Sequence, residues 1–272
     1  MPASDLLILG GSGLLGTALV AEAETLGLDW AATHHIASRE GGRWHRIDLT
    51  DPTAVDDLLA ATAPRAIVNA AYVQNGDSLW PLTAELPGRL ARYSSGVARL
   101  VHVSSDVVFD GSPERPYRED DPVGPVHDYG RAKVAAERAV AEADPAAVIV
   151  RTSLLWGGAG DGGPQVRLVQ DPGVRFFTDE YRNPLDVESL ASACLELVER
   201  TDIRGPLHVA GPHRVDRLTF ARALAPLAGI DPDSLQGGTG ADQPGRPADV
   251  SLDTSLAVSL LDTELRGLPS AD

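Results

Sequence analysis

The stretch DLLILGGSGLLGTALVAEAETL, residues 5–26, decides the fold of this chain. It opens with a short apolar run, residues 5–9, which is typical of a buried parallel strand. Glycines follow at positions 10, 11, 13 and 16, and residues 14–26 have the apolar spacing of a helix without a proline. A strand, a glycine-rich turn and a helix in this order predict a βα unit at the start of a parallel sheet.

The glycines of this turn have separate physical roles. We expect Gly10 to permit the tight turn, Gly13 to let the backbone approach a pyrophosphate, and Gly16 to let the helix pack against the strand. The N–H groups and the dipole at the helix start favour an anion. The turn therefore predicts a dinucleotide site made by Gly10, Ser12, Gly13, Leu14, Leu15 and Gly16. The alternative interpretation is a plain glycine-rich βα turn.

The same alternation continues along the chain. Strand-like runs recur at residues 30–33, 66–69, 99–104 and 148–151, and helical patterns lie at residues 53–63, 84–93 and 129–142. This order predicts an α/β fold with a doubly wound parallel sheet of the Rossmann type.

The pattern changes after residue 152. A turn-rich loop, GGAGDGGP at residues 157–164, is followed by a helical pattern at residues 188–200 and a strand-like run at residues 206–210. A second helical pattern at residues 218–227 is interrupted near Pro226. We expect residues 1–152 to form the dinucleotide-binding domain with the catalytic residues. Residues 153–272 are expected to form mainly a small C-terminal substrate-binding lobe that is interwoven with the main sheet.

Composition limits the classes of partner. The 272 residues carry a formal net charge of -16, which disfavours nucleic acid. The single cysteine, Cys194, cannot form an internal disulfide and is interpreted as a small core residue. No run approaches the roughly 18 apolar residues of a membrane span, and the start MPASDLLILGG lacks the basic region of a signal peptide. We expect a cytoplasmic protein without membrane contact.

The end of the second predicted strand bears on the choice of cofactor. An acidic residue there binds the ribose 2′-hydroxyl of NAD and repels the 2′-phosphate of NADP. This chain has no acid at that point and places His34 and His35 there, followed by Ser38 and Arg39. These hydrogen-bond donors favour NADP, with NAD as the alternative. The other interpretation is that His34 and His35 are exposed loop residues.

Tyr129 and Lys133 form a Y-x-x-x-K motif at the start of a predicted helix. Residues four apart share a helix face, so the phenol and the ammonium point the same way. The 23 basic residues include one lysine, and it is Lys133, which indicates a need for a compact ammonium at this position. Upstream, Ser104 and Ser105 follow a predicted strand, and ligands of doubly wound sheets bind at the carboxyl ends of strands.

Ser105, Tyr129 and Lys133 together suit hydride exchange with a carbonyl group. Tyr129 would act as the acid in reduction and as the base in oxidation. Lys133 would lower the Tyr129 pKa and bind ribose hydroxyls, and Ser105 would hold the substrate oxygen. The nicotinamide carries the hydride itself.

These motifs resemble the extended short-chain dehydrogenase/reductase family, and within it the dTDP-4-dehydrorhamnose reductases and related sugar-nucleotide reductases. The matching stretches run over nearly the whole chain: residues 8–19, 48–51, 68–71, 101–111, 129–137, 151–157, 179–191 and 246–253. The most specific is SSDVVFDG at residues 104–111, which is similar to the S-T-D-Y-V-F-D-G of that family and gives Ser105 the catalytic place. Leu154 stands where the rhamnose enzymes have a tryptophan.

The resemblance implies further site residues and a homodimer. Those along the cofactor are Asp48, Leu49, Asn69, Ala70, Ala71 and Thr152, and those near the substrate are Asp106, Val107, Trp156, Arg182 and Arg246. Arg246 would face the nucleotide part of the substrate. The alternatives are a helix cap for Asp48, a core position for Trp156, and a surface pair of Glu180 with Arg182.

These predictions point to an NADPH-dependent reductase of a carbonyl group, on a nucleotide-linked keto-sugar or a similar polar ketone. One alternative is a non-catalytic NADP-binding regulatory subunit, because the regulatory subunit of methionine adenosyltransferase resembles the same family. Another is a sugar-nucleotide epimerase. His102, His208 and His213 lack the spacing of metal ligands, so no metal is expected.

Overall fold

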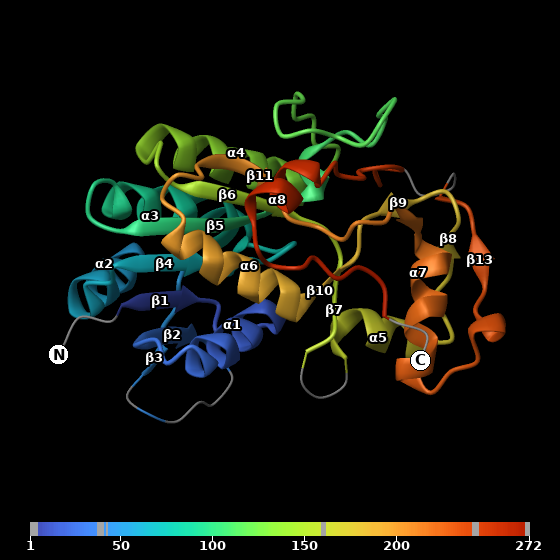
Figure 1. Ribbon diagram of the computed structural model, residues 1–272, viewed down its shortest axis with the longest axis horizontal. Coiled ribbons are helices and arrows are strands. Elements are labelled where there is room, and N and C mark those ends of the chain that lie inside the picture. Colours follow the sequence, from blue (N-terminus) through green and yellow to red (C-terminus); the bar gives the residue numbers. More distant parts are fainter. Residues whose placement is uncertain (1–4, 37–40, 42, 159–161, 241–244, 270–272) are drawn as a thin grey trace.

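The computed structural model describes residues 5–36, 41, 43–158, 162–240 and 245–269. Its centre is a parallel sheet of seven strands, and the predicted doubly wound α/β fold is confirmed (Figure 1). From one edge to the other the strands are β11 (Gly205–His208), β6 (Val148–Thr152), β5 (Arg99–Ser105), β4 (Ala66–Asn69), β1 (Leu6–Leu9), β2 (Trp30–His34) and β3 (Trp44–Arg46). The strand order reverses beside β1, which is where ligands bind in such sheets.

Helices cover both faces of this sheet because each strand sends alternate side chains to opposite sides. Leu6 and Ile8 of β1 pack in a cluster with α1 (Leu14–Thr25) and α6 (Val187–Glu199), and α8 (Ser255–Leu260) adds to the same side. Leu7 and Leu9 pack on the other side with α2 (Pro52–Thr62), α3 (Leu86–Ser94) and α4 (Asp128–Ala143). All four leucine and isoleucine side chains are buried.

A smaller lobe lies at one end of the sheet, on the right of Figure 1. It contains α5 (Gly163–Gln170), α7 (Arg217–Leu224), the strand pair β8 (Phe176–Phe177) with β13 (Gly237–Gly238), and the pair β9 (Tyr181–Arg182) with β12 (Val215–Asp216). The pair β7 (Leu155–Trp156) with β10 (Leu185–Asp186) leads into it. The lobe has its own apolar cluster around Val166, Phe176 and Phe220. Because α6, β11 and α8 return to the main sheet, the chain after residue 152 contributes to both parts.

The structure differs from the sequence pattern at a few elements. The helix expected from residue 84 starts earlier, as the π-helical segment η1 (Leu79–Glu85), and continues as α3, whose second residue is Pro87. A proline cannot donate the backbone bond that a continuous helix needs there. The interruption expected near Pro226 is confirmed: the helix predicted at residues 218–227 ends at Leu224 and tightens into the 3-10 turn η3 (Ala225–Ala228). Two further 3-10 turns are η2 (Asp106–Val108) and η4 (Pro232–Ser234).

Two further expectations concern burial. Cys194 is fully buried in the core, and burial raises the pKa of its thiol to about 12, as expected of a structural cysteine. Among the helices that the structure describes, none combines the length and apolar character needed to cross a bilayer.

Candidate active site

The glycine turn is shaped by close backbone contacts. Gly10 has a φ of +78°, and a Cβ there would lie 2.9 Å from the Cα of Ala71. A Cβ at Gly16 would overlap the carbonyl oxygen of Gly10, and one at Gly13 would lie 3.3 Å from that oxygen. Helix α1 begins after Gly13, where no side chain of the described residues caps it. Its first N–H groups can therefore receive an anion, so the turn fits a pyrophosphate.

A cavity of about 320 Å³ opens beside this turn. The carboxyl ends of β1, β2 and β4 supply most of its walls, and the segment after β3 and the start of η1 supply the rest. Its walls include nine of the predicted cofactor residues: Gly10, Ser12, Gly13, His34, His35, Asp48, Leu49, Ala70 and Ala71. The structure thus brings most of the predicted cofactor set to one place.

For four of the other predicted cofactor residues, the structure shows no place in these walls. The side chain of Leu15 belongs to the core, and Leu14 lines a second cavity of about 560 Å³ beside α1 and α6. Asn69 is fully buried, and its Oδ1 accepts a hydrogen bond from the Ala71 amide over 3.2 Å, so its side chain shapes the turn after β4. Arg39 lies outside the described residues. A direct role of these four in binding stays a prediction.

The alternative interpretations of three wall residues have different outcomes. His34 is 9% exposed at the end of β2, so it is not an exposed loop residue, whereas His35 is exposed. Asp48 is not the helix cap: the N-cap of α2 is Asp51. The carboxylate of Asp48 accepts hydrogen bonds from the hydroxyl and the amide of Thr50, which lower its pKa.

The ends of β5 and α4 bring the predicted catalytic side chains together. Ser105 is the last residue of β5, and Tyr129 and Lys133 lie in the first turns of α4. A Cβ at Gly130 would overlap the carbonyl oxygen of Val107, so the glycine lets the helix approach the segment that follows β5. Tyr129 and Lys133 thus lie in the first turns of one helix, as predicted, and this helix packs closely against the segment that follows Ser105.

Burial controls the titration of Tyr129. It raises the pKa of the phenol well above the usual value, and the nearby Tyr72 and Asp106 act in the same direction. A hydrogen bond with Ser105 acts in the opposite direction but is outweighed. The lowered Tyr129 pKa that the sequence predicts is therefore not present, because desolvation disfavours the phenolate. At neutral pH Tyr129 is a protonated phenol that can donate its proton.

Lys133 is held by a different set of contacts. Its side chain is 2% exposed, and Nζ donates a hydrogen bond to the carbonyl oxygen of Val103 over 2.8 Å. Burial lowers the pKa of the ammonium to about 8, while the charge of Glu137 opposes this shift. The ammonium is therefore still mostly charged at neutral pH.

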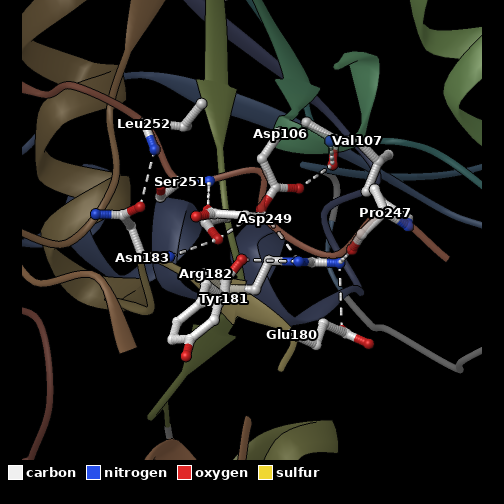
Figure 2. Close-up of polar contacts among 12 residues, drawn as sticks. Asp106, Val107, Glu180, Tyr181, Arg182, Asn183, Pro247, Asp249, Ser251 and Leu252 are labelled. Carbon is white, nitrogen blue, oxygen red and sulfur yellow. Dashed lines mark hydrogen bonds and ion pairs between the residues drawn. The ribbon is translucent and has the colours of Figure 1, made fainter. Parts of the chain in front are cut away.

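Asp106 lies directly behind Ser105 and is 4% exposed. Its Oδ1 accepts a hydrogen bond from the Ser105 hydroxyl over 3.1 Å, and its Oδ2 accepts one from the Ser153 hydroxyl over 2.6 Å. The Nε of Arg182 lies 3.8 Å from Oδ2 (Figure 2). Both carboxylate oxygens are thus engaged by the protein, which makes Asp106 a support for the serine. A direct contact of Asp106 or Val107 with a substrate stays a prediction.

Arg182 joins several segments of the site. Its guanidinium donates to the carbonyl oxygens of Tyr181 and Pro247, and its Nη2 lies 3.2 Å from Oε1 of Glu180 (Figure 2). Glu180 and Arg182 are 4% and 5% exposed, so the interpretation as a surface pair is wrong. A buried arginine with these partners fixes the position of β9 relative to Asp106.

Glu180 also faces two further arginines. Arg246 binds its carboxylate with Nε and Nη2 at 2.9 and 3.1 Å, and Nε of Arg217 lies 3.9 Å away. Burial lowers the pKa of Arg217 to about 10. Arg217 and Arg246 line a cavity of about 320 Å³ with Arg175 and Phe177, and the Arg246 guanidinium lies 5.2 Å from the centroid of the Phe177 ring. The cavity therefore combines positive charge with an aromatic surface.

The structure gives different outcomes for Trp156, predicted near the substrate, and Thr152, predicted along the cofactor. Trp156 is half-buried, its indole N–H donates to the carbonyl oxygen of Gly267, and its ring packs on the lobe cluster, which supports the core interpretation. Thr152 ends β6 and is 5% exposed, and its Oγ1 has no hydrogen-bond partner among the described residues. A buried hydroxyl without a partner is a position where a ligand or water is expected to bind.

Tyr72 is a residue of this site that the sequence reading missed. It follows Ala71 and lines the cavity beside the glycine turn. Its ring centroid lies 5.8 Å from that of Tyr129. A usable signal exists, because Tyr72 comes directly after the predicted strand of residues 66–69, where a ligand is expected. The described residues contain no group of three or more His, Cys, Asp or Glu side chains placed to hold a metal ion.

Comparison with known proteins gives consistent results. Residues 4–268 match the family described as the RmlD substrate binding domain. A dTDP-4-dehydrorhamnose reductase of Mycobacterium tuberculosis is 34% identical over 93% of this chain and 84% of its own length. The bovine (Bos taurus) methionine adenosyltransferase 2 subunit beta is 28% identical over 96% of this chain and 83% of its own. The structure of dTDP-4-dehydrorhamnose reductase from Bacillus anthracis in complex with NADP superposes with a TM-score of 0.81 at 20% identity, covering 98% of this chain and 96% of that one.

Proposed function

Because this chain belongs to the RmlD substrate binding domain family of extended short-chain dehydrogenase/reductases, we propose that it is an NADPH-dependent reductase of a carbonyl group. The substrate is a nucleotide-linked keto-sugar or a similar polar ketone. The observation that carries the proposal is the meeting of Ser105, Tyr129 and Lys133 at one strand end, next to the glycine turn.

The cofactor proposal rests on the turn and the cavity beside it. The glycines leave room for a pyrophosphate at the start of α1, and His34 and His35 stand in the cavity wall where an NAD-specific site has an acid. These features favour NADP, and a structural neighbour of the same fold holds NADP. When bound, the nicotinamide supplies the hydride.

Each catalytic side chain has one task in the proposed reaction. Reduction leaves negative charge on the carbonyl oxygen, which needs a proton and a hydrogen bond. Tyr129 donates the proton, since its raised pKa keeps it protonated at neutral pH. Ser105 positions the substrate oxygen, and Asp106 holds Ser105. Lys133 supplies a positive charge that stabilises the phenolate left on Tyr129.

The arginine cavity is the proposed site for the nucleotide part of the substrate. Arg182, Arg217 and Arg246 face the carboxylate of Glu180, and Arg182 also faces that of Asp106. Three arginines against two carboxylates leave positive charge for an anionic group such as a diphosphate. The ring of Phe177 offers a stacking surface for a base. In this proposal residues 1–152 bind the cofactor and residues 153–272 mainly bind the substrate.

The first test is binding of the cofactor. We expect NADPH to enhance its nicotinamide fluorescence on titration with the protein and to bind more tightly than NADH, and Gly13→Asp to abolish binding by placing a carboxylate at the pyrophosphate. A screen of keto-sugar nucleotides then follows NADPH consumption, with Tyr129→Phe as the inactive control. Binding of neither cofactor would overturn the proposal, and turnover without net NADPH consumption would indicate an epimerase.

A second candidate function is a non-catalytic NADP-binding regulatory subunit. It is supported by the likeness to the methionine adenosyltransferase subunit beta over nearly the whole chain. This candidate expects NADPH binding without turnover of any keto-sugar nucleotide, and a change in the kinetics of a methionine adenosyltransferase on mixing. The complete set of Ser105, Tyr129 and Lys133 favours the reductase.

We also propose a cytoplasmic homodimer, which the family resemblance supports. Light scattering of the purified protein at several concentrations measures the oligomeric state directly. A mass of one chain at all concentrations would contradict the dimer.

A further inference from the structure

The ammonium of Lys133 lies close to two aromatic rings. Its Nζ is 5.3 Å from the ring centroid of Tyr72 and 5.8 Å from that of Tyr129. The two rings are 5.8 Å apart at an angle of 41°. Cations within about 6 Å of a ring centroid are attracted by the negative face of the ring. Tyr72 thus approaches the charge of Lys133 from the cavity beside the glycine turn.

The other groups around Lys133 leave much of its charge uncompensated. From β5 the carbonyl oxygen of Val103 accepts a hydrogen bond from Nζ of Lys133. The pKa of the buried His102 is lowered by burial and by the Lys133 charge. On α4 itself Glu137 faces Lys133, but this carboxylate is already paired with Arg151 at 2.8 Å. The neighbouring part of η1 contributes apolar side chains to the cluster beside α4.

We propose that Tyr72 is a positioning residue, which holds the ammonium charge of Lys133 in the buried site through the face of its ring. The functional part of this inference rests on the proposed role of Lys133 in the reductase. Tyr72 is 50% exposed and lines the cofactor cavity, so a ligand that fills the cavity covers the ring. Covering excludes water and strengthens the attraction between ring and charge.

The effect on Lys133 is large enough to measure because its pKa of about 8 lies close to neutrality. Lowering this pKa by about one unit would reduce the charged fraction at pH 7.5 from about three quarters to about one quarter. The phenol of Tyr72 is itself uncharged at this pH, since the partial burial of the side chain raises its pKa. A Tyr72 variant without a ring therefore changes the charge state of the catalytic lysine.

The test uses the fact that Lys133 is the sole lysine of the chain. Labelling with [ε-13C]lysine gives one lysine Cε signal, and its shift against pH reports the Lys133 pKa without cofactor or substrate. We expect Tyr72→Leu, which keeps an apolar cover, to lower this pKa by about one unit, and Tyr72→Phe, which keeps the ring, to change it little. Tyr93→Leu is the matched control, because Tyr93 lies on α3 with its hydroxyl on the carbonyl oxygen of Leu59.

The outcomes separate clearly. A Lys133 pKa that is unchanged or raised in Tyr72→Leu would show that the ring only covers the lysine, and would overturn the proposal. If Tyr72→Leu does not fold, Tyr72→Trp replaces it: the stronger ring face of tryptophan is expected to raise the pKa, and a lowered value would contradict the proposal. Because no turnover is needed, failure here differs from failure of the reductase proposal, which NADPH binding and turnover decide.

Discussion

The Ser153 hydroxyl and the Asp106 carboxylate form a hydrogen bond of 2.6 Å between segments that directly follow β6 and β5. The other oxygen of the same carboxylate accepts a hydrogen bond from the Ser105 hydroxyl. The backbone N–H of Asn183 in turn donates a hydrogen bond to the Ser153 hydroxyl over 3.2 Å. The proposed catalytic serine is therefore linked by three hydrogen bonds in series, through Asp106 and Ser153, to the segment that carries Arg182.

Asp106→Asn is expected to destabilise the protein and to impair catalysis. The change removes a buried negative charge next to Arg182, and losing one partner of a buried pair costs about 3–5 kcal/mol of unfolding free energy. Ser153→Ala keeps the charge and should cost about 1–2 kcal/mol. Urea unfolding measures both values, and once a substrate is known, kcat should fall about 100-fold in Asp106→Asn through misplacement of Ser105.

Asp128→Asn is the control for this pair of changes. Its carboxylate is 74% exposed and pairs with Arg131 one turn away, so its loss should change the unfolding free energy by less than about 0.5 kcal/mol. Equal effects at Asp106 and Asp128 would contradict a supporting role for Asp106.

Because of Lys133, the free energy of unfolding should depend on pH in the alkaline range. Its pKa is about 8 in the folded protein against 10.5 for a free side chain, so between these values the unfolded chain binds more protons than the native one. Stability relative to Lys133→Met therefore rises with pH across this window, by about 3 kcal/mol for a shift of this size. Urea unfolding of both proteins from pH 7 to 10.5 checks the slope, and a constant or falling difference would refute the lowered pKa.

Gly10→Ala should abolish NADPH binding, whereas Gly27→Ala should not. Both glycines have positive φ, +78° and +69°, so an alanine is strained at either position by about 1 kcal/mol. An added Cβ at Gly27 meets open space among the described residues, but at Gly10 it comes within 2.9 Å of the Ala71 backbone and displaces the turn. Fluorescence titration of both variants with NADPH isolates the contact, and equal affinities would exclude a role for the Gly10 turn.

Arg246→Ala should weaken binding of the nucleotide part of the substrate. Calorimetric titration with dTDP or UDP is expected to give a dissociation constant about 10–100-fold higher, since a charge-assisted pair with a diphosphate is lost. Arg246→Lys should recover part of the affinity, because an ammonium keeps the charge without the bidentate geometry. Arg131→Ala, at an exposed arginine of α4, is the control. Unchanged affinity in Arg246→Ala would place the nucleotide elsewhere.

Much of the fold was predictable from short-range patterns. The apolar run and glycines around Gly10 are local, and the periodicity of strands and helices predicted the layers of the parallel sheet and the interruption near Pro226. The prediction was wrong at the helix expected from residue 84, which starts earlier and changes type near Pro87. The spacing of Tyr129 and Lys133 on one helix face follows from helix geometry alone. The position of Ser105 follows from its place at a strand end.

Only the tertiary structure decided how these groups are held and charged. The sequence by itself determined the strand ends and the helix start on which the proposed catalytic side chains lie, because periodicity and turn geometry act over a few residues. The contacts of Asp106 with Arg182, and of Tyr72 with Lys133, join segments far apart in the chain. The pKa values of Tyr129 and Lys133 depend on burial, which is a property of the packed molecule: desolvation disfavours both charged forms more than their neighbours in the sequence can compensate.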